Sequence, residues 1–587
     1  MVNLTIDGKE IRVQKGTTIL EAAKKAGIRI PTLCYLKEVS ETAACRICLV
    51  KVEGQERLSA SCNTLCEEGM VISTTAPEVL KARKTNLKLL LSRHNTSCTT
   101  CVRDGNCTLQ ELSKEMNLLD NDFPVSFPKK KWDEALLLQR DASKCVQCLR
   151  CVNICGKIQS VNVWELRGTG AGAHVGIRDG LSFGEAGCTY CGQCITHCPT
   201  GALSERDDTE VFRSFADDAE LTTVVQIAPA VRTGFAEATG LTKAQGTEQR
   251  MAAALKKLGA DYVFSTDFTA DLTIMEEGNE LLRRIAEKGT AAEAAKRGEK
   301  VFYPMFTSCC PGWVRFLKIN YPDMAGCLSS AKSPQQMFGA VTKTYFAEKT
   351  GIPAEKIRCV SIMPCTAKKY EAAVREVNST GERDVDLSLT TRELGRMLRG
   401  TDVAALPEVG FDSLLGEYTG AGSIFGATGG VMEAALRTAY FVVNGRDPKA
   451  DAFKEVRAEN ADPALLKCWR DAEFKLGDAT LSVAVASGLK NARALVEAIR
   501  AGLVMYDFVE IMACPGGCAG GGGQPFTDGE EKAFARGKEL YRLDASRAVR
   551  FSHKNREVLK LYETYLGSPL SEKAEELLHT DQETWEL

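Results

Sequence analysis

Net charge, long apolar runs and a leader segment are all lacking in this sequence of 587 residues. A formal charge of only −3 excludes the basic footprint that binding to nucleic acid or to an anionic membrane surface leaves. No uninterrupted apolar stretch reaches the ~18–20 residues that cross a bilayer, and the N-terminal segment MVNLTIDGKEIRV has no basic region followed by an apolar one. We therefore expect a cytoplasmic protein with no nucleic-acid partner and no membrane span.

A dinucleotide-binding fingerprint is lacking as well. No G-x-G-x-x-G motif follows a predicted strand in a βαβ setting, so this chain alone is not expected to bind a nicotinamide cofactor. The length nevertheless predicts roughly three to five domains of ~100–200 residues each. The chemistry is therefore expected from other residue patterns, spread over several domains.

Cysteine, in contrast, is abundant, with 24 residues. Such a number indicates either the disulfide framework of an exported protein or metal thiolates in a reducing compartment. The lack of a leader favours the second interpretation. The short, regular spacing favours it more strongly, because thiolates that bind a cluster must converge on one small inorganic body.

The first predicted domain, residues 1–78, has the element order of a β-grasp ferredoxin. VNLTIDGKEIRV alternates apolar and polar residues around an Asp-Gly turn, which predicts a β-hairpin, and GTTILEAAKKAGI predicts a helix that follows Thr18. Four cysteines follow in the spacing C-x10-C-x2-C-x13-C, which departs from the plant ferredoxin interval C-x4-C-x2-C. We expect Cys66 to be a buried packing residue. The expected ligands of one 2Fe-2S cluster are Cys34, Cys45, Cys48 and Cys62.

The second predicted segment, residues 79–125, carries one histidine and three cysteines in the spacing H-x3-C-x2-C-x5-C. These residues are His94, Cys98, Cys101 and Cys107. A zinc knuckle with a Cys3His ligand set would use the same residue types, and we keep it as the alternative. The position between two ferredoxin-like segments favours a 4Fe-4S cluster with one histidine ligand, which would raise the reduction potential.

The third predicted domain, residues 126–209, contains the motif C-x2-C-x2-C-x3-C twice, as bacterial two-cluster ferredoxins do. The first run is Cys145, Cys148, Cys151 and Cys155, and the second is Cys188, Cys191, Cys194 and Cys198. In this motif the fourth cysteine of each run completes the other 4Fe-4S cluster, so we expect Cys155 and Cys198 to cross over. Gly156 replaces the usual proline, and a Gly-rich insertion separates the runs. His174 and His197 are expected to be surface or packing residues.

From about residue 210, short apolar runs alternate with amphipathic helical patterns. The predicted strands are TTVVQIAP, DYVFST, KVFYPMFTS, IRCVSIMPC, LSVAVASG and YDFVEIMAC. This alternation predicts parallel sheets covered by helices, in which ligands bind beyond the carboxyl ends of the strands. We expect this α/β domain to span residues 210–540. A helical, charged segment without a motif of its own follows at 541–587, in which His553 and His579 are expected at the surface.

Three cysteine motifs follow predicted strands of this domain: TSCCPGW, MPCTAKKYE and MACPGGC. Adjacent side chains at a strand end point to opposite sides, so one cluster is not expected to bind both Cys309 and Cys310; if Cys310 is a ligand, Cys309 is a free thiol beside the cluster. Ser308 and Pro311 are typical of a helix start, whose dipole would stabilise a thiolate. The expected ligands of one 4Fe-4S cluster are Cys310, Cys365, Cys514 and Cys518.

With TSCCPGW, MPCTAKKYE and EIMACPGGCAGGGGQP, the chain resembles an FeFe hydrogenase of the large clostridial type, with four accessory clusters ahead of a catalytic domain. The resemblance covers nearly the whole chain. It implies an H-cluster, in which the 4Fe-4S unit is joined through Cys518 to a two-iron unit with carbonyl, cyanide and azadithiolate ligands. The glycines after Cys514 would let backbone approach this bulky cofactor.

The resemblance also implies roles for residues around the H-cluster. Cys309 would exchange protons with the two-iron unit, Lys368 would bind a cyanide ligand, and Met363 and Met512 would pack against the unit; the alternative for both methionines is a plain core role. The outward proton path would comprise Glu277, Glu280, Ser329 and Arg284. The alternative for the charged residues is a solvated helix face. Three further cysteines are expected to be packing residues, namely Cys327, Cys359 and Cys468.

The expected function is therefore reversible H2 activation, with electrons passing through one 2Fe-2S and three accessory 4Fe-4S clusters. Ferredoxin, or flavin- and NAD(P)-binding partner subunits, or both, would exchange the electrons, and maturation proteins would supply the two-iron unit. Two alternative functions are possible: that of an electron-transfer protein like the iron–sulfur subunit of respiratory complex I, and that of a non-catalytic relative in sensing or cluster assembly. The first leaves the three motifs of the α/β domain unexplained, and the second usually loses the free thiol or the proton path.

Overall fold

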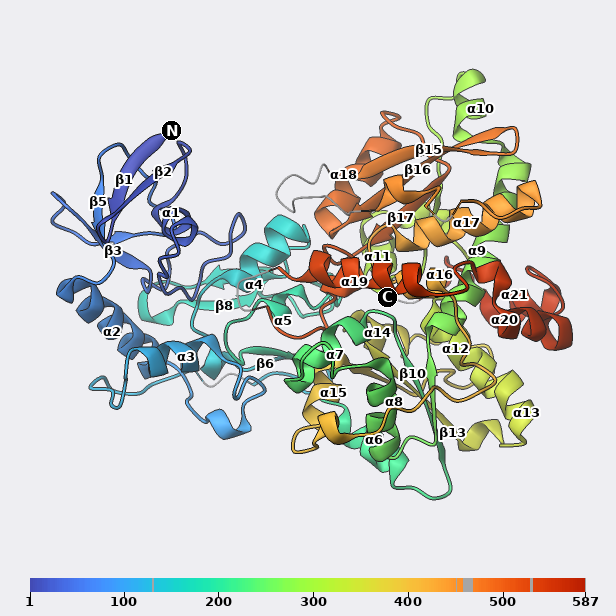
Figure 1. Cartoon of the computed structure of the whole chain (residues 1–587), viewed down its shortest axis with the longest axis horizontal. Coiled ribbons are helices and arrows are strands. Elements are labelled where there is room, and N and C mark those ends of the chain that lie inside the picture. The colour runs from blue at the N-terminus through green and yellow to red at the C-terminus, as the bar shows by residue number, and fades with distance from the viewer. Residues whose placement is uncertain (129–130, 450, 458–467, 528–530, 586–587) are drawn as a thin grey trace.

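The computed structural model describes residues 1–128, 131–449, 451–457, 468–527 and 531–585. In Figure 1 a small sheet lies near the N-terminus at one end of the molecule, cysteine-rich segments follow it, and a larger α/β part with two sheets fills the other end. The expected α/β multidomain order is thereby confirmed. Within the described ranges, every helix is too short or too polar to cross a bilayer.

The N-terminal sheet has the strand order β2-β1-β5-β3-β4. Its strands are β1 (Val2–Ile6), β2 (Lys9–Val13), β3 (Leu49–Val52), β4 (Ser59–Ala60) and β5 (Val71–Ser73). The expected hairpin joins β1 and β2, and Asp7 and Gly8 at its turn have positive φ angles of 49° and 80°. Helix α1 (Ile19–Lys25) begins where predicted, because the Thr18 hydroxyl accepts a hydrogen bond from the backbone N–H of Glu21.

The cysteine-rich segments consist mostly of short helices and strands joined by long loops. They are α2 (Pro77–Ser92), α3 (Thr108–Glu115), β6 (Leu138–Arg140), α4 (Arg150–Asn153), β7 (Trp164–Arg167), β8 (His174–Ile177), α5 (Gln193–Thr196) and β9 (Leu203–Glu205). Strand β6, before the first cysteine run, pairs with β9, after the second run, so the two ends of the two-cluster ferredoxin region lie side by side. The Gly-rich insertion between the two cysteine runs is the tip of the β7–β8 hairpin, which leaves the two runs free to face each other.

Two four-stranded sheets form the α/β part. The first has the order β11-β10-β13-β14 and is wholly parallel, with β10 (Thr222–Ile227), β11 (Tyr262–Ser265), β13 (Ile357–Met363) and β14 (Leu387–Thr390). The second has the order β12-β17-β16-β15, with β12 (Met305–Phe306), β15 (Arg470–Leu476), β16 (Ala479–Ser487) and β17 (Phe508–Met512). Only its edge strand β15 runs antiparallel.

All six predicted strands are present, and two others were not predicted. Strand β12 is shorter than its apolar run, since Pro304 has no N–H for the ladder. Strand β14 is only four residues long, and β15 presents charged residues on its exposed face, so neither has the continuous apolar run of a buried parallel strand.

Helices surround both sheets. In chain order they are α6 (Thr209–Ala216), α7 (Val231–Thr239), α8 (Glu248–Lys257), α9 (Asp267–Lys288), α10 (Ala291–Lys296), α11 (Pro311–Asn320), α12 (Pro334–Val341), α13 (Ala347–Thr350), α14 (Ala367–Glu371), α15 (Thr391–Met397), α16 (Gly420–Ile424), α17 (Gly430–Asn444), α18 (Leu489–Arg500), α19 (Ala533–Ser546), α20 (Arg556–Leu561) and α21 (Glu572–Leu578). The 22-residue helix α9 packs against α12, α16 and α17.

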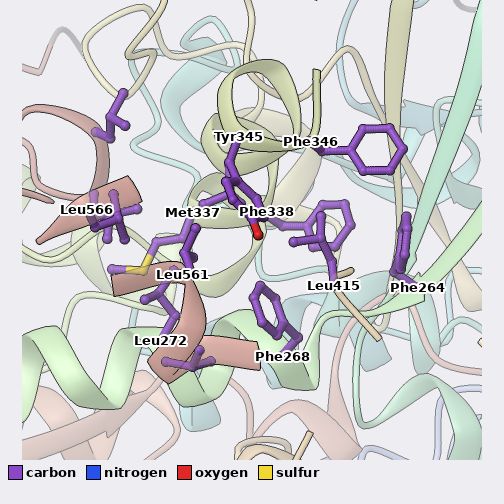
Figure 2. Packing of buried hydrophobic residues seen from close by; sticks show 14 of the residues in the cluster. Phe264, Phe268, Leu272, Met337, Phe338, Tyr345, Phe346, Leu415, Leu561 and Leu566 are labelled. Carbon is purple, nitrogen blue, oxygen red and sulfur yellow. The ribbon is translucent and has the colours of Figure 1, made fainter. Parts of the chain in front are cut away.

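The C-terminal helices are part of the core. In Figure 2, Phe268 and Leu272 of α9 lie near Met337 of α12 and Leu561 of α20, and all four side chains are buried. Figure 1 shows the same arrangement, with α20 and α21 beside α9 and α12. The segment after residue 541 is therefore helical as predicted, and it covers one end of the helix that carries the expected proton path.

The predicted surface position of two histidines is wrong. His553 is buried, since its ring stacks on Phe441 with 4.0 Å between ring centroids and its Nε2 bonds to Asp447. The side chain of His579 is only 7% exposed. The assignment of Cys468 to packing is also wrong, because this cysteine is exposed.

Other residues lie as expected. Cys66 and Cys359 are buried, and Cys327 packs against the core of the second sheet. Of the two histidines in the two-cluster ferredoxin region, His197 is buried and bonds to the Gln193 carbonyl, while His174 is partly exposed.

A buried carboxylate joins the ferredoxin-like region to the α/β part. Glu205 of β9 accepts two hydrogen bonds from Arg392, at 3.0 and 2.6 Å, and one from Arg396 at 2.8 Å, both on α15. Burial raises the pKa of Glu205, but the two guanidinium groups more than offset burial and hold this pKa well below its usual value. The joint therefore depends on a charged carboxylate.

Replacing Glu205 tests this joint. Glu205→Ala should lower the free energy of unfolding by about 3–5 kcal/mol, because it leaves the buried guanidinium of Arg392 without its counter-charge. The measurement is urea denaturation followed by tryptophan fluorescence at equal cluster content. Asp207→Ala is the matched control, since Asp207 lies 3.5 Å from Arg396 but is half exposed, and such a pair contributes at most about 1 kcal/mol. A loss no larger than that of the control would show that the joint stabilises little.

Candidate active site

The expected active-site cysteines lie beyond the carboxyl ends of strands from both sheets. Cys365 follows β13 of the first sheet, Cys514 and Cys518 follow β17 of the second, and Cys309 and Cys310 follow β12. The parallel strands direct these ends to one place, as the α/β pattern predicts. Helix α11 begins with Pro311, as expected, but Cys310 and not Ser308 is the residue before its first turn. Ser308 instead donates a hydrogen bond to the Ala331 carbonyl.

The four expected ligand cysteines lie close together; Cys514 is buried and the other three are partly buried. Burial raises the pKa of the Cys365 thiol to about 12, and Cys310 is the next cause. Burial also raises the pKa of Cys514 and of Cys518, and the neighbouring thiols add to the effect. Buried thiols that oppose one another's ionisation need a cationic centre to become thiolates together. This donor set therefore fits a 4Fe-4S unit.

The glycines of this loop have a structural reason that the sequence did not reveal. A Cβ on Gly521 would lie 2.0 Å from the Pro364 carbonyl oxygen, and one on Gly522 would lie 2.1 Å from that of Cys191. Gly517 has a φ of +85°, and its Cβ would lie 2.7 Å from the backbone nitrogen of Thr428. The expected reason was backbone approach to a cofactor. The structure shows that these glycines let the loop press against other protein backbone.

Cys309 lies beside this set, since Cys310 and Cys518 are among the groups that act on its thiol and share a hydrophobic cluster with it. Burial raises the pKa of its thiol, and the Glu277 carboxyl group is the second cause. Its backbone carbonyl accepts a hydrogen bond of 3.1 Å from Lys368, which is itself buried and donates at 2.8 Å to Glu371. Glu371 was not predicted, although its spacing of three residues from Lys368 places both on one helix face.

The charged residues of α9 form a chain that leads outward from Cys309. Among the described residues, none makes a regular hydrogen bond to either carboxyl oxygen of Glu277. Burial raises the pKa of Glu277 to about 8, with Glu280 as the second cause. Glu280 accepts hydrogen bonds from the Ser329 hydroxyl at 2.6 Å and from Arg284 at 2.7 Å. Arg284 is partly exposed, so the chain reaches the surface.

The pKa of Glu280 is shifted in the opposite direction to that of Glu277. Burial raises the pKa of Glu280, but Arg284, Ser329 and the backbone N–H of Ser330 more than offset burial, so this pKa lies below its usual value. The structure thus brings together the four residues expected for the path. It gives the two glutamates different roles, because one tends to hold a proton and the other a charge.

The two methionines are buried at the ends of their strands. Met512 shares a hydrophobic cluster with Cys309 and Cys518, while Met363 packs in the core of the first sheet. Both positions suit packing in the core. Met512 is the one that lies among the site residues.

The cysteines of the two-cluster ferredoxin region form two groups, each around its own cavity. One cavity is lined by Cys145, Cys148, Cys151 and Cys198, and the other by Cys155, Cys188, Cys191 and Cys194. This is the crossover expected from the motif. A third cavity is lined by His94, Cys98, Cys101 and Cys107.

The β-grasp cysteines form two neighbouring pairs. Cys34 contacts Cys45, and a hydrogen bond between the two thiols lowers the pKa of Cys34 to about 6. Cys48 contacts Cys62 in the same way, which lowers the pKa of Cys48 to about 7. The thiols of both pairs affect one another electrostatically. These four residues therefore also lie within one site.

The cysteine groups follow one another toward the active site. The Cys514 thiol donates to the Cys191 carbonyl at 3.7 Å, so the active-site group adjoins the second ferredoxin group. Arg150, buried between the groups, donates to the Tyr35 carbonyl at 2.9 Å. Burial lowers the pKa of Arg150, while Cys148 and Cys34 raise it, which places this cation between two cysteine groups. Its role was not predicted, since its contacts come from distant segments.

Family models cover most of the chain. They match "Iron only hydrogenase large subunit, C-terminal domain" at residues 221–522 and "Iron hydrogenase small subunit" at 530–582. The N-terminal part matches a 2Fe-2S iron-sulfur cluster binding domain at 1–77, the NADH-ubiquinone oxidoreductase-G iron-sulfur binding region at 83–121 and a 4Fe-4S dicluster domain at 144–202. The chain therefore has 2Fe-2S and 4Fe-4S binding domains and an H-cluster domain, and the match at 83–121 favours iron–sulfur over zinc.

Individual proteins agree with the family models. The chain is 44% identical over 592 aligned residues to the NADP-reducing hydrogenase subunit HndD of Solidesulfovibrio fructosivorans, with 99% of this chain and 98% of the relative covered. It is 36% identical to iron hydrogenase 1 of Clostridium pasteurianum, with 99% of both covered. An apo FeFe hydrogenase structure from Chlamydomonas reinhardtii covers 64% of this chain and 98% of its own, at 40% identity and a TM-score of 0.54. The buried cysteine pocket at the meeting point of two sheets, with these matches, shows that the chain belongs to the FeFe hydrogenase family.

Proposed function

We propose that this chain catalyses the reversible interconversion of H2 with two protons and two electrons. The observation that carries the proposal is the position of Cys309. Its buried thiol lies between the pocket of four ligand cysteines and the outward chain that begins at Glu277. A proton carrier between a metal pocket and an outward path is what this reaction requires.

The proposed ligands of the H-cluster are Cys310, Cys365, Cys514 and Cys518. When bound there, the H-cluster would supply the iron site at which H2 is split or formed. The buried ammonium of Lys368 would hold an anionic ligand of the two-iron unit in a pocket that excludes water. Met512 and Met363 would fill space around the unit and keep the pocket apolar.

The proposed proton path runs from Cys309 through Glu277, Ser329 and Glu280 to Arg284. Because the pKa of Glu277 is raised to about 8, this residue can take up and release a proton at neutral pH with little cost. Glu280, which is buried beside the partly exposed Arg284, receives the proton, and Arg284 favours its return to the charged form. The path then returns to its starting state, because Glu277 binds a proton more tightly than Glu280 does.

The cysteine groups of the N-terminal half are proposed to carry electrons. We propose one 2Fe-2S and three accessory 4Fe-4S clusters, in domains at 1–78, 79–125 and 126–209 ahead of a catalytic domain at 210–540 and a helical segment at 541–587. The two outermost groups, at Cys34 and at His94, give two possible exits. The contact between Cys514 and Cys191 supports transfer into the active site.

We further propose that partner subunits bearing flavin and NAD(P) receive the electrons in the cytoplasm, alone or beside ferredoxin. The similarity to a relative named as an NADP-reducing hydrogenase subunit supports this arrangement, since the sequence lacks a dinucleotide fingerprint of its own. Maturation proteins would supply the two-iron unit. The alternative of a non-catalytic iron–sulfur protein is not favoured, because Cys309, Glu277 and Glu280 are all present.

Infrared spectroscopy tests the proposed function directly. The matured, anaerobically purified protein should show metal carbonyl and cyanide bands that shift under H2. The same chain produced without the maturation proteins is the control and should show none. If bands are missing despite demonstrated maturation of another hydrogenase in the same cells, the chain is an electron carrier on a hydrogenase scaffold.

Removing the free thiol tests its role as proton carrier. Cys309→Ala should keep the infrared bands and the iron content but lower H2 turnover by at least about 100-fold, the scale of general acid–base catalysis. Cys359→Ala removes an equally buried thiol from β13 and should leave turnover nearly unchanged. Full activity of the Cys309 variant would contradict the assignment.

Replacing Glu277 by glutamine tests the path while keeping the shape of the side chain. Glu277→Gln should lower turnover by about 100-fold or more, since an amide cannot carry the proton. Asp271→Asn is the matched control: Asp271 lies on the same helix, is also buried and has a pKa raised by burial to about 6, but bonds to Thr419 and Asn555 away from the path. Equal losses in the two variants would indicate a general defect of α9.

A further inference from the structure

The turn that binds Glu280 is held from outside by the C-terminal segment. Ser329 donates its hydroxyl to Glu280 at 2.6 Å, and the backbone N–H of Ser330 donates at 3.1 Å. Residues 578–580 lie antiparallel to residues 330–332, with Thr580 N–H donating to the Ser330 carbonyl at 2.8 Å. The Gln582 side chain donates to the Ser329 carbonyl at 3.0 Å. Two of the three residues that bind Glu280, Ser329 and Ser330, therefore belong to a turn that the chain end supports; the third is Arg284.

His579 is the side chain of this segment that links the turn to α9. Its Nδ1 lies 2.8 Å from the Ser330 hydroxyl, and its Nε2 lies 3.0 Å from a carboxyl oxygen of Glu276. Glu276 also accepts from the Tyr562 hydroxyl and from the backbone N–H of Leu570. Because a carboxylate can only accept hydrogen bonds, the proton of the His579 ring is best placed on Nε2, which donates to Glu276. The unprotonated Nδ1 then accepts a hydrogen bond from the Ser330 hydroxyl.

We infer that His579 is a positioning residue for Glu280 in the proton path. This inference rests on the proposed function and assigns a task to the segment that the sequence left without a motif. Glu276 and Glu280 lie one turn apart on α9, so a closed ring of contacts runs from Glu276 through His579 and Ser330 to Glu280. The ring fixes the distance between the turn and the helix.

A fixed distance matters because proton transfer is steep in distance and needs donor and acceptor at hydrogen-bond length. Without the His579 bridge, the hydroxyl of Ser330 loses this partner, and on its outer side the turn keeps the contacts to the backbone of residues 578–580 and to Gln582. On its inner side it keeps the hydrogen bonds to Phe306 and Ser308. Ser329 would then spend less time at bonding distance from Glu280. His579 itself touches neither the ligand cysteines nor Cys309 in any recorded contact among the described residues, so its effect must be indirect.

The test compares three variants of the matured full chain with a matched control. His579→Gln removes the two-sided bridge, Ser330→Ala removes the hydroxyl at its other end, and the double variant tests whether the two act through one contact. His553→Gln is the control, because His553 is also buried and hydrogen-bonded in the C-terminal segment, but contacts Asp447 and Phe441 instead of the turn.

Three measurements separate positioning from folding. H2 turnover in H2O and D2O reports the proton step, infrared bands report an intact two-iron unit, and amide hydrogen exchange of the peptide spanning residues 328–332 reports the turn in the chain made without maturation. We expect His579→Gln and Ser330→Ala to lower turnover by about ten-fold each, with a larger solvent isotope effect, unchanged infrared bands and faster exchange of the turn. The double variant should lose no more than about the larger single loss.

The inference is overturned if His579→Gln and Ser330→Ala stay within about two-fold of the unmodified enzyme, or if His553→Gln causes the same loss and the same isotope effect. Additive losses in the double variant would also contradict a shared contact. Should the unmodified protein show neither infrared bands nor turnover, the proposed function fails on its own. The exchange of residues 328–332 still decides whether His579 positions the turn.

Discussion

The mutual opposition of four clustered thiols to ionisation is the constraint on which the rest of this structure depends. Cys310, Cys365, Cys514 and Cys518 follow strands of two different sheets, and neighbouring thiols raise the pKa of three of them. The iron of an H-cluster bound by these cysteines would supply the opposing charge, and the cluster would then join the two sheets at their carboxyl ends in addition to packing. The same constraint applies to the accessory cysteine groups, in two of which four cysteines also surround one cavity.

Close backbone approach follows from this constraint. The loop after Cys514 must bring two ligands to the pocket while it lies against Pro364 of the first sheet and Cys191 of the ferredoxin-like region. Only glycine permits contacts of this kind, since a Cβ would collide with carbonyl oxygens. The same glycines that shape the active site therefore also hold the nearest electron-carrying group against it. Catalysis and electron supply share one interface.

Much of this could be predicted from the sequence, because both local patterns and ligand spacing are short-range signals. The strands β10, β13 and β17 are buried along most of their length and are rich in apolar residues, and the cysteine runs have intervals typical of ferredoxins. What could not be predicted depends on distant partners. His579 contacts Glu276, which lies 303 positions away in the sequence. A histidine outside any motif, in a charged helical stretch, does not indicate such a contact. Glu371 and Arg150 were overlooked for the same reason.

The support of the Ser329 turn by residues 578–582 has a consequence for how the protein is made. Chains fold from the N-terminal side during synthesis, so the ligand cysteines and α9 leave the ribosome well before the segment that contains His579. During that interval the turn lacks its outer strand and the Gln582 and His579 contacts. The outer wall of the proposed proton path is thus completed later than the ligand cysteines and α9.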